Sequence, residues 1–402
     1  MLYETDTAQD IADEVESIGK ILFNNPKAEI LTVEQIQDLV EDYLMRSERR
    51  DVARAYIRYR YRKEVARATS STFFDAIGEK LTASNIQNQN ANVDEKSFGG
   101  RMGEATGVMT RQYALDNLIS SKHAKNHINN RIYIHDLDAY AVGMHNCLSI
   151  PFDDLLANGF KTRQTDVRPA NSVNTAMQLI AVIFQLQSLQ QFGGVSATHL
   201  DWTMVPYVRK SFFKHWKDGN KYILNNQDAD NLVFFSDKSI EDDYYKDGAY
   251  QYAMDMTIRE VHQAVEGMYH NLNTLQSRSG NQLPFTSINY GTCTLPEGRM
   301  VTKELLEVSI EGLGAKYITS IFPCGIFQCM KGVNREPGDP NYDLFRLALQ
   351  STAKRLYPNY ANVDWSNNAG YDLSDPRTYF STMGKRKLHP IQNLLNCARR
   401  CA

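Results

Sequence analysis

Long hydrophobic runs are missing from this sequence of 402 residues. Its most apolar segment, residues 179–184, is flanked by glutamines, whereas a membrane-spanning helix needs about 18 or more apolar residues in a row. The N-terminus (MLYETDTAQDIADEVES) is acidic and lacks the basic-then-apolar order of a signal peptide. These absences predict a cytoplasmic protein with no membrane partner.

A large excess of charge of either sign is also missing. The 44 Lys and Arg residues nearly balance the 47 Asp and Glu residues, which leaves a formal net charge of −3 and a pI near 6.3. Nucleic-acid-binding domains are usually basic, so no nucleic-acid partner is expected. Hydrophobic residues make up 42% of the chain, enough for a sizeable core in two domains or in one large barrel.

Closely paired cysteines are lacking as well, since the six cysteines of the chain include no CxxC pair. In a chain of this size, scattered cysteines argue against a disulfide framework and indicate a reducing compartment. The loose pairs Cys324/Cys329 and Cys397/Cys401 leave a four-thiolate zinc site open, on weak spacing alone. The remaining possibility for cysteine chemistry is that a single cysteine is catalytic.

The first 65 residues predict a small helical unit. Thr32 and Gln35 have the spacing of a capping box at the start of one helix. A second helix, from about Asp51, carries three arginines on one side: Arg54, Arg58 and Arg62. These arginines fit a solvated basic face and also a site for nucleotide phosphates. The sequence leaves both interpretations open.

The rest of the chain alternates short apolar runs with longer segments. Residues 69–103 are rich in Asn, Gln, Ser and Gly and predict a loop-rich linker. Residues 171–192 predict a buried helix, with Asn171 as its cap, and residues 342–356 a further helix. Strands are predicted at 131–135, 284–290, 318–322 and 326–330. Buried strands that alternate with long helices predict an α/β core with a parallel sheet.

The cysteine with the most specific surroundings is Cys147, which follows His145 and Asn146. From these three residues alone, a buried structural cysteine is the ordinary interpretation. The longer segment IHDLDAYAVGMHNCLSIPFDDLLANGF, however, resembles the first barrel-strand region of anaerobic, class III ribonucleotide reductases. In that family an Asn-Cys pair presents a thiol to the nucleotide sugar.

Four other blocks resemble the same family in the same order: NANVDEKSFGGRMGEA, QLIAVIFQLQSLQQFGGVSATHLD, NLNTLQSRSGNQLPFTSINYGT and SIFPCGIFQCMKGVNREPGDPNYDL. The resemblance covers residues 85–384 almost continuously. It implies an α/β fold, a ten-stranded α/β barrel made of two parallel five-stranded halves, incomplete here. Pyruvate formate-lyase shares that barrel.

The N-terminal helices (DLVEDYLMRSERRDVARAYIRYRYRKE) resemble the closing helices of an ATP-cone, a domain through which ATP and dATP act as allosteric effectors. The resemblance divides the chain into a partial ATP-cone at 1–65, a linker and opening segment at 66–110, the N-terminal part of the reductase barrel at 111–384, and an aberrant tail at 385–402. The basic strand that opens the cone in the family is not found, so weak nucleotide binding is expected.

The sequence departs from the family at Lys385. The family has Met-Gly-Cys-Arg on a finger loop inside the barrel, and this cysteine becomes a thiyl radical. Here Met383 and Gly384 are followed by Lys385 and Arg386, and a lysine has no S–H bond through which to relay a radical. The glycyl-radical segment and the zinc site of the family's C-terminal domain are not found either. We therefore expect a portion truncated at both ends, by a frameshift, an intervening element or a split gene, and inactive alone.

The resemblance implies anaerobic reduction of ribonucleoside triphosphates to deoxyribonucleotides for DNA synthesis, with radical chemistry drawn from a glycyl radical. Cys147 would face the 2′ side of the sugar, and Asn146 and His145 would hold it. The turn Gly193–Gly194 with Ser196 would approach the substrate closely; a plain helix C-cap remains equally open for the glycines. The implied partners are a radical S-adenosylmethionine activating enzyme, a second copy of the chain in a homodimer, and either formate or a thioredoxin-type reductant.

Two other functions stay open. A pyruvate formate-lyase-like glycyl radical acyltransferase would need adjacent cysteines on the finger loop and no cone remnant. A non-catalytic fragment that binds nucleotide or a partner subunit is favoured by Lys385. In either case Cys293, Cys324 and Cys329 are expected to be core thiols rather than redox partners.

Overall fold

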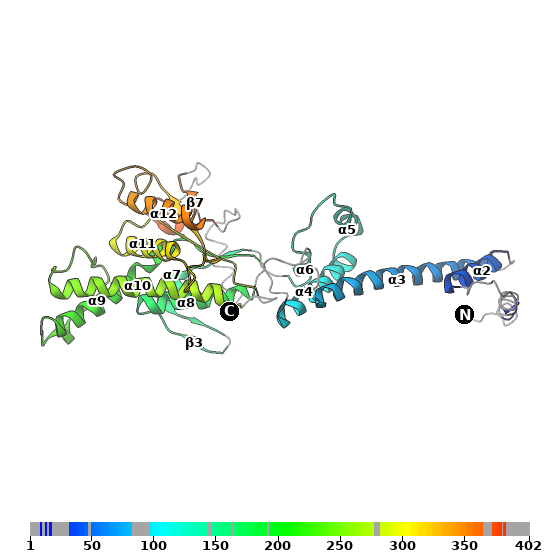
Figure 1. Cartoon of the computed structure of the whole chain (residues 1–402), viewed down its shortest axis with the longest axis horizontal. Coiled ribbons are helices and arrows are strands. Elements are labelled where there is room, and N and C mark those ends of the chain that lie inside the picture. The colour runs from blue at the N-terminus through cyan, green and yellow to red at the C-terminus, as the bar shows by residue number, and fades with distance from the viewer. Residues whose placement is uncertain are drawn as a thin grey trace. The chain divides into compact units, whose positions relative to one another are not determined.

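Figure 1 shows the computed structural model of the chain. It describes residues 32–46, 50–82, 96–143, 147–162, 164–190, 193–276, 282–364, 372–379 and 381–382, together with Gln9, Asp13, Glu16 and Ser17. The chain divides into two units, Met1–Glu79 and Lys80–Ala402, and each is described by itself.

Two helices dominate the first unit, α2 (Val33–Arg46) and α3 (Arg50–Thr82). The capping box is confirmed: Thr32 N donates to Gln35 Oε1 over 2.7 Å, and Gln35 N donates to Thr32 Oγ1 over 3.2 Å. Arg60 of α3 joins the two helices through ion pairs with Asp38 and Glu41. This pairing supplements the small amount of apolar surface that two helices bury against each other.

The expected loop-rich linker is wrong over much of its length. The helix α3 continues to Thr82, and α4 (Phe98–Tyr113) begins with Ser97 as its N-cap, whose hydroxyl accepts from Gly100 N over 2.9 Å. The run of Asn and Gln that suggested a loop lies within residues 83–95, which are outside the described residues. The predicted linker was therefore too long at both ends, where the residues form helices.

The second unit is built on a parallel sheet with the strand order β1-β4-β5-β6-β7. Its strands are β1 (Leu148–Ser149), β4 (Val195–Ala197), β5 (Thr286–Tyr290), β6 (Cys324–Cys329) and β7 (Asn359–Asn362). A separate antiparallel pair joins β2 (Phe160–Lys161) to β3 (Asp166–Val167). The parallel α/β fold is confirmed, and among the described residues the sheet has five of the ten strands that a complete barrel would have.

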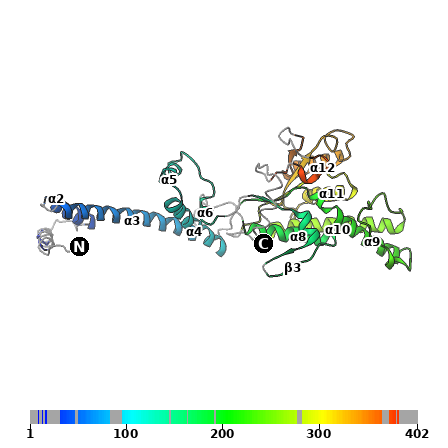
Figure 2. The same ribbon diagram turned by 180° about the vertical axis from the view of Figure 1, so that it is seen from behind.

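Helices connect the parallel strands, because a parallel pair needs a crossover between its ends. They are α7 (Phe152–Asn158), α8 (Val173–Ser188), α9 (Leu200–Tyr222), α10 (Gly248–Thr274), α11 (Pro296–Glu311) and α12 (Tyr342–Arg355). The short helices α5 (Ser121–Ile128) and α6 (Leu137–Tyr140) and the π-helical turn η2 (Ala114–Leu118) precede β1. Helix α10 packs along both α8 and α9, as Figures 1 and 2 show from opposite sides. No helix within the described ranges is long and apolar enough to cross a membrane.

The two faces of the sheet differ in chemistry. In the register of the sheet, Ser196 pairs with Ser287 and Ser287 with Cys324, so these residues share a face. With Asn289, two residues along β5, they form what we call the polar face. The alternate residues form the opposite face and belong to the main apolar core under the helices: Val195, Ala197, Ile288, Tyr290 and Phe327. Parallel strands are usually apolar on both sides, so the polar face indicates a functional surface.

Two predicted strands are wrong. Residues 131–135 form no strand, and Tyr133 is 79% exposed; residues 318–322 contribute only an isolated bridge between Ile318 and Leu313. Both segments have β-branched or aromatic residues, but within the described part of the chain neither pairs with a strand of the sheet, and strand propensity depends on that packing. The strands predicted around 284–290 and 326–330 are present as β5 and β6.

The ends of the buried helix α8 also differ from the prediction. Ser172, not Asn171, is its N-cap, and the Ser172 hydroxyl accepts from Thr175 N over 3.2 Å. The helix ends at Ser188 with Leu189 as its C-cap. Gly193 and Gly194 therefore do not cap this helix, and they directly precede β4.

Candidate functional site

The thiol of Cys147 lies at the edge of the polar face. Cys147 directly precedes β1, and Gly194 directly precedes β4. Because Leu148 pairs with Val195 in the parallel register, Cys147 and Gly194 come side by side, and Gly194 N donates to Cys147 Sγ over 3.4 Å. The structure thus brings together two residues that the sequence had placed in one site. Neither Asn146 nor His145 belongs to the described residues.

Gly194 is required by the packing of the protein itself. A Cβ at this position would lie 2.9 Å from Cδ1 of Phe285 and 3.4 Å from its carbonyl oxygen. Carbon atoms in contact are normally about 3.5–4.0 Å apart. The sequence analysis expected a substrate to approach this glycine closely. At Gly194 it is Phe285 that does so.

Ser196 is fully buried on the polar face. Its hydroxyl accepts from Asn289 Nδ2 over 3.1 Å and lies 3.4 Å from the carbonyl oxygen of Ala197 and 3.5 Å from that of Thr382. The hydroxyl thus has protein hydrogen-bond partners in Asn289, Ala197 and Thr382. These contacts favour a structural role for Ser196 over the substrate contact expected from the sequence.

Asn289, which the sequence analysis did not single out, forms the densest set of hydrogen bonds on this face. Its Oδ1 accepts from Thr382 N over 3.1 Å, and its Nδ2 donates to Thr382 O over 3.1 Å and to Ala197 O over 2.9 Å. Its side chain is fully buried. Thr382 directly precedes the Met-Gly-Lys sequence at 383–385. An asparagine in the middle of an otherwise buried strand was the available signal, since such a group needs partners.

The carboxyl end of β5 is held by a buried carboxylate. Asp201 Oδ2 accepts from Gly291 N over 2.8 Å and from Cys293 N over 2.9 Å. Burial raises the pKa of Asp201, although the backbone donors of Cys293 and Gly291 oppose this effect. Asn341 Nδ2 donates to the carbonyl oxygens of the same two residues, over 3.2 Å to Gly291 and 2.8 Å to Cys293. These bonds fix the turn that follows β5.

The remaining described cysteines have the properties of core thiols. Burial raises the pKa of Cys293 and Cys324, and it raises the pKa of Cys329 to about 11. Cys324 and Cys329 are the first and last residues of β6, too far apart to bind one metal ion. Within the described part of the chain, no three His, Cys, Asp or Glu residues are grouped as metal ligands.

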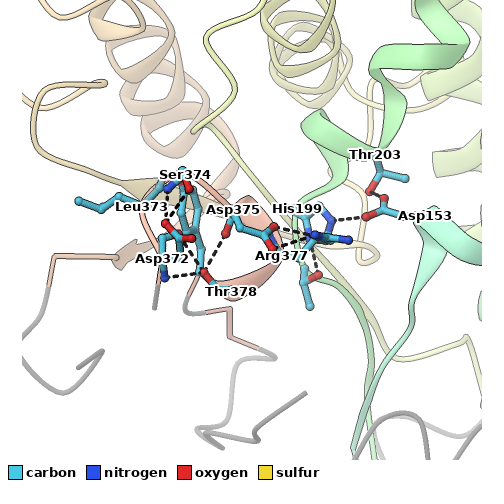
Figure 3. A network of polar contacts seen from close by, with 11 residues as sticks. Asp153, His199, Thr203, Asp372, Leu373, Ser374, Asp375, Arg377 and Thr378 are labelled. Carbon is cyan, nitrogen blue, oxygen red and sulfur yellow. Dashed lines mark hydrogen bonds and ion pairs between the residues drawn. The ribbon is translucent and has the colours of Figure 1, made fainter. Parts of the chain in front are cut away.

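A second polar network lies at the carboxyl end of β4 (Figure 3). His199 Nε2 and Asp153 Oδ2 are 2.8 Å apart, and Thr203 Oγ1 donates to Asp153 Oδ1 over 2.6 Å. Burial raises the pKa of Asp153, but the hydrogen bond and charge of His199 outweigh it, so that the pKa is lowered. Arg377 donates to both carboxylate oxygens of Asp375 over 2.9 Å, and its charge also lowers the pKa of Asp153. The segment around Arg377 therefore lies near the His199–Asp153 pair, a few residues before Thr382.

A parallel α/β sheet with a thiol at the edge of a polar face, preceded by a helical unit, is the architecture expected of the glycyl-radical reductases. The family model described as anaerobic ribonucleoside-triphosphate reductase matches residues 89–388. This chain belongs to that family. A second family model, the ATP cone domain, matches residues 3–65.

The chain is similar to named members of this family. It is 31% identical over 352 residues to the anaerobic ribonucleoside-triphosphate reductase of Haemophilus influenzae, covering 87% of this chain and 46% of that protein. It is 32% identical over 279 residues to that of Enterobacteria phage T4, covering 69% of this chain and 42% of that protein. The chain thus spans less than half the length of these curated relatives.

Among solved structures, the chain is similar to the anaerobic ribonucleotide reductase from Thermotoga maritima with glycerol in the active site. The TM-score is 0.49 at 14% identity, over 77% of this chain and 51% of that chain. The same protein in complex with dATP and CTP gives a TM-score of 0.47 at 14% identity, over 77% of this chain and 50% of that one.

Proposed function

We propose that this chain provides the Cys147-bearing part of an anaerobic ribonucleoside-triphosphate reductase, in which ribonucleoside triphosphates become deoxyribonucleotides for DNA synthesis. The observation that carries the proposal is the position of Cys147 beside Gly194, at the edge of the polar face. Membership of the family supports the class of reaction.

In this proposal, each residue near the thiol has a separate task. A glycyl radical, when the family's glycyl segment is present, supplies the means to remove a hydrogen atom from the ribose. Cys147 faces the 2′ side of the sugar, where its thiol acts on the substrate after that hydrogen has left. Asn146 and His145 bind the sugar hydroxyls, and Gly193 and Gly194 keep the backbone beside the thiol free of side chains.

The proposed partners follow from the family. A radical S-adenosylmethionine enzyme would generate the radical, formate or a thioredoxin-type protein would supply electrons, and a second copy of the chain would complete a homodimer. ATP and dATP would act as effectors through the ATP cone. The scattered, unpaired spacing of the cysteines supports a reducing, cytoplasmic location.

One observation favours a second function. By the resemblance of its sequence, Lys385 takes the place of the family's radical-forming cysteine, and a lysine cannot relay a radical. A non-catalytic role in binding nucleotide or a partner subunit would use the same sheet without that chemistry.

Protection of Cys147 from alkylation tests the proposed site in either case. A ribonucleoside triphosphate bound over the polar face should slow the reaction of Cys147 with iodoacetamide several-fold, and peptide mass spectrometry reports each cysteine separately. Cys329, packed against the apolar core, is the reference thiol, and inorganic tripolyphosphate is the control ligand. Equal rates with and without nucleotide would contradict the proposed site.

A further inference from the structure

We propose that Asn289 is a positioning residue that holds Thr382, the residue directly before the Met-Gly-Lys sequence, against the polar face that carries Cys147. The proposal rests on the proposed function in one respect, namely that this sequence occupies the place of the family's finger loop. The contacts of Asn289 are independent of that assignment.

The first argument is the reciprocity of the contact. Asn289 Oδ1 accepts from the Thr382 N–H, and Asn289 Nδ2 donates to the Thr382 carbonyl, each over 3.1 Å. A side-chain amide that binds both backbone groups of one residue acts like a neighbouring strand. It fixes the direction of the chain at Thr382 as well as its position, which a single hydrogen bond does not do.

The second argument is the burial of Asn289. Its side chain is 0% exposed, and a buried amide without partners costs about 1–3 kcal/mol on mutational scales. Among the hydrogen bonds of the described residues, its Nδ2 has acceptors on Ser196 and Ala197 in β4, whereas its Oδ1 has Thr382 N alone. The native sheet therefore needs Thr382 in this place to satisfy the buried oxygen.

The third argument is the distance to the thiol along β4. Ser196, whose hydroxyl lies 3.5 Å from Thr382 O, comes two residues after Gly194, which donates to Cys147. Two residues of a strand span about 6.6 Å and point to the same face. Cys147 contacts Gly194 and Thr382 contacts Ser196, so both lie at the polar face, two positions apart along this segment.

The segment upstream of Thr382 lies near a second polar group of residues. Arg377 binds Asp375 beside the His199–Asp153 pair at the carboxyl end of β4, as Figure 3 shows. The chain therefore passes near the His199–Asp153 pair at Arg377 and contacts Ser196 of β4 at Thr382. The bonds of Thr382 with Asn289 fix the position of the last described residue before residue 383.

Hydrogen exchange at the Thr382 amide measures the contact directly in the chain as it exists. Asn289→Ala removes the acceptor, so exchange at Thr382 should rise about tenfold, the change expected for one hydrogen bond, while amides of β6 keep their protection. Ser196→Ala leaves the Asn289–Thr382 pair intact, and Asn334→Ala removes a buried asparagine that bonds Gly291 O and Gln328 O instead. Neither control should change exchange at Thr382. Unchanged exchange at Thr382 in a folded Asn289→Ala variant overturns the proposal.

A proximity measurement completes the test. In a Lys385→Cys background, a short bismaleimide should link the new thiol to Cys147, and both Asn289→Ala and Thr382→Pro should reduce the yield several-fold. Thr382→Pro removes the N–H donor without altering β5, so it decides the case if Asn289→Ala does not fold. A yield that neither variant lowers refutes the positioning role and leaves the proposed function standing. No link at all, with Thr382 still protected by Asn289, refutes the finger-loop assignment and leaves the contact standing.

Discussion

The N–H of Gly194 points at the thiol of Cys147 over 3.4 Å, although 47 positions separate the two residues in the chain. The same glycine has Phe285 against it, 2.9 Å from the place of a Cβ. Gly194 thus both donates a hydrogen bond to the thiol and allows Phe285 to pack closely at the edge of the sheet.

Gly194→Ala should lower the free energy of unfolding by about 1–3 kcal/mol, the usual effect of overpacking, and should speed alkylation of Cys147. Urea denaturation and alkylation kinetics measure the two effects. Gly267→Ala is the matched control, since nothing lies within 4 Å of its added Cβ in α10, and it should stabilise the helix by about 0.5–1 kcal/mol. Phe285→Leu should suppress part of the loss. A Gly194→Ala variant as stable as the parent would show that the contact relaxes freely.

Asp201→Ala should be among the most destabilising single changes in the second unit. It leaves the N–H groups of Gly291 and Cys293 buried without their acceptor, at about 1–3 kcal/mol for each. Asp201→Asn keeps one oxygen for both donors and should cost less. Asp339→Ala breaks two similar bonds, to Arg335 N and Glu336 N, in a turn near the surface, where water replaces the carboxylate. Equal losses for Asp201→Ala and Asp339→Ala in thermal or urea unfolding would contradict this account.

The His262–Glu304 pair between α10 and α11 should make stability depend on pH. Burial lowers the pKa of His262, but the hydrogen bond from its Nδ1 to Glu304 Oε2 at 2.9 Å and the charge of Glu304 outweigh it, so the pKa is raised above 6.5. Burial also raises the pKa of Glu304 above 4.5. Since both groups bind protons more tightly in the folded state, their contribution is full at low pH and is lost as pH rises through the folded values.

Urea titrations between pH 5 and 9 should therefore show the free energy of unfolding falling above about pH 6.5, the unfolded value for histidine. His262→Gln should flatten this fall. His270→Gln, at a more exposed pair with Glu266, should leave it nearly unchanged, because surface pairs contribute little. The same slope in the parent and in His262→Gln would assign the dependence to other groups.

The chain with Lys385 should not convert ribonucleoside triphosphates to deoxynucleotides, even with an activating enzyme and S-adenosylmethionine. The reason is chemical, since the lysine side chain has no weak S–H bond to pass a hydrogen atom. Chromatographic detection of deoxynucleotides, with electron paramagnetic resonance for a radical, is the measurement. If deoxynucleotides form and their formation requires Lys385, then Lys385 does not stand in place of the radical-forming cysteine.

Cys147 should become essential once Lys385→Cys is combined with the glycyl-radical part of a relative. Cys147→Ala should abolish turnover but keep nucleotide binding and the radical signal, because its thiol acts after hydrogen abstraction. Cys293→Ala is the control: it should turn over, at a loss of about 1–3 kcal/mol in stability. Normal turnover by Cys147→Ala would show that another residue holds this role.

The sequence alone determined the features that depend on near neighbours in the chain. The Thr32–Gln35 capping box, the strand at β5 and the helix α12 follow from residues within a few positions of one another. The alternation of Ser287, Ile288, Asn289 and Tyr290, which makes one face of β5 polar, is also visible in the sequence. The blocks around Cys147 were sufficient to indicate the family.

Only the tertiary structure decided which distant groups meet. Parallel strands pair through long crossovers, so their hydrogen-bond partners leave no local pattern. Residues 318–322 have the composition of a strand but form only the isolated bridge between Ile318 and Leu313, and the contacts of Ser196 with Asn289 and Thr382 leave no pattern in the sequence. The contact between Asn289 and Thr382, 93 residues apart, depends on the register of β4 and β5 and on the return of the chain to their polar face.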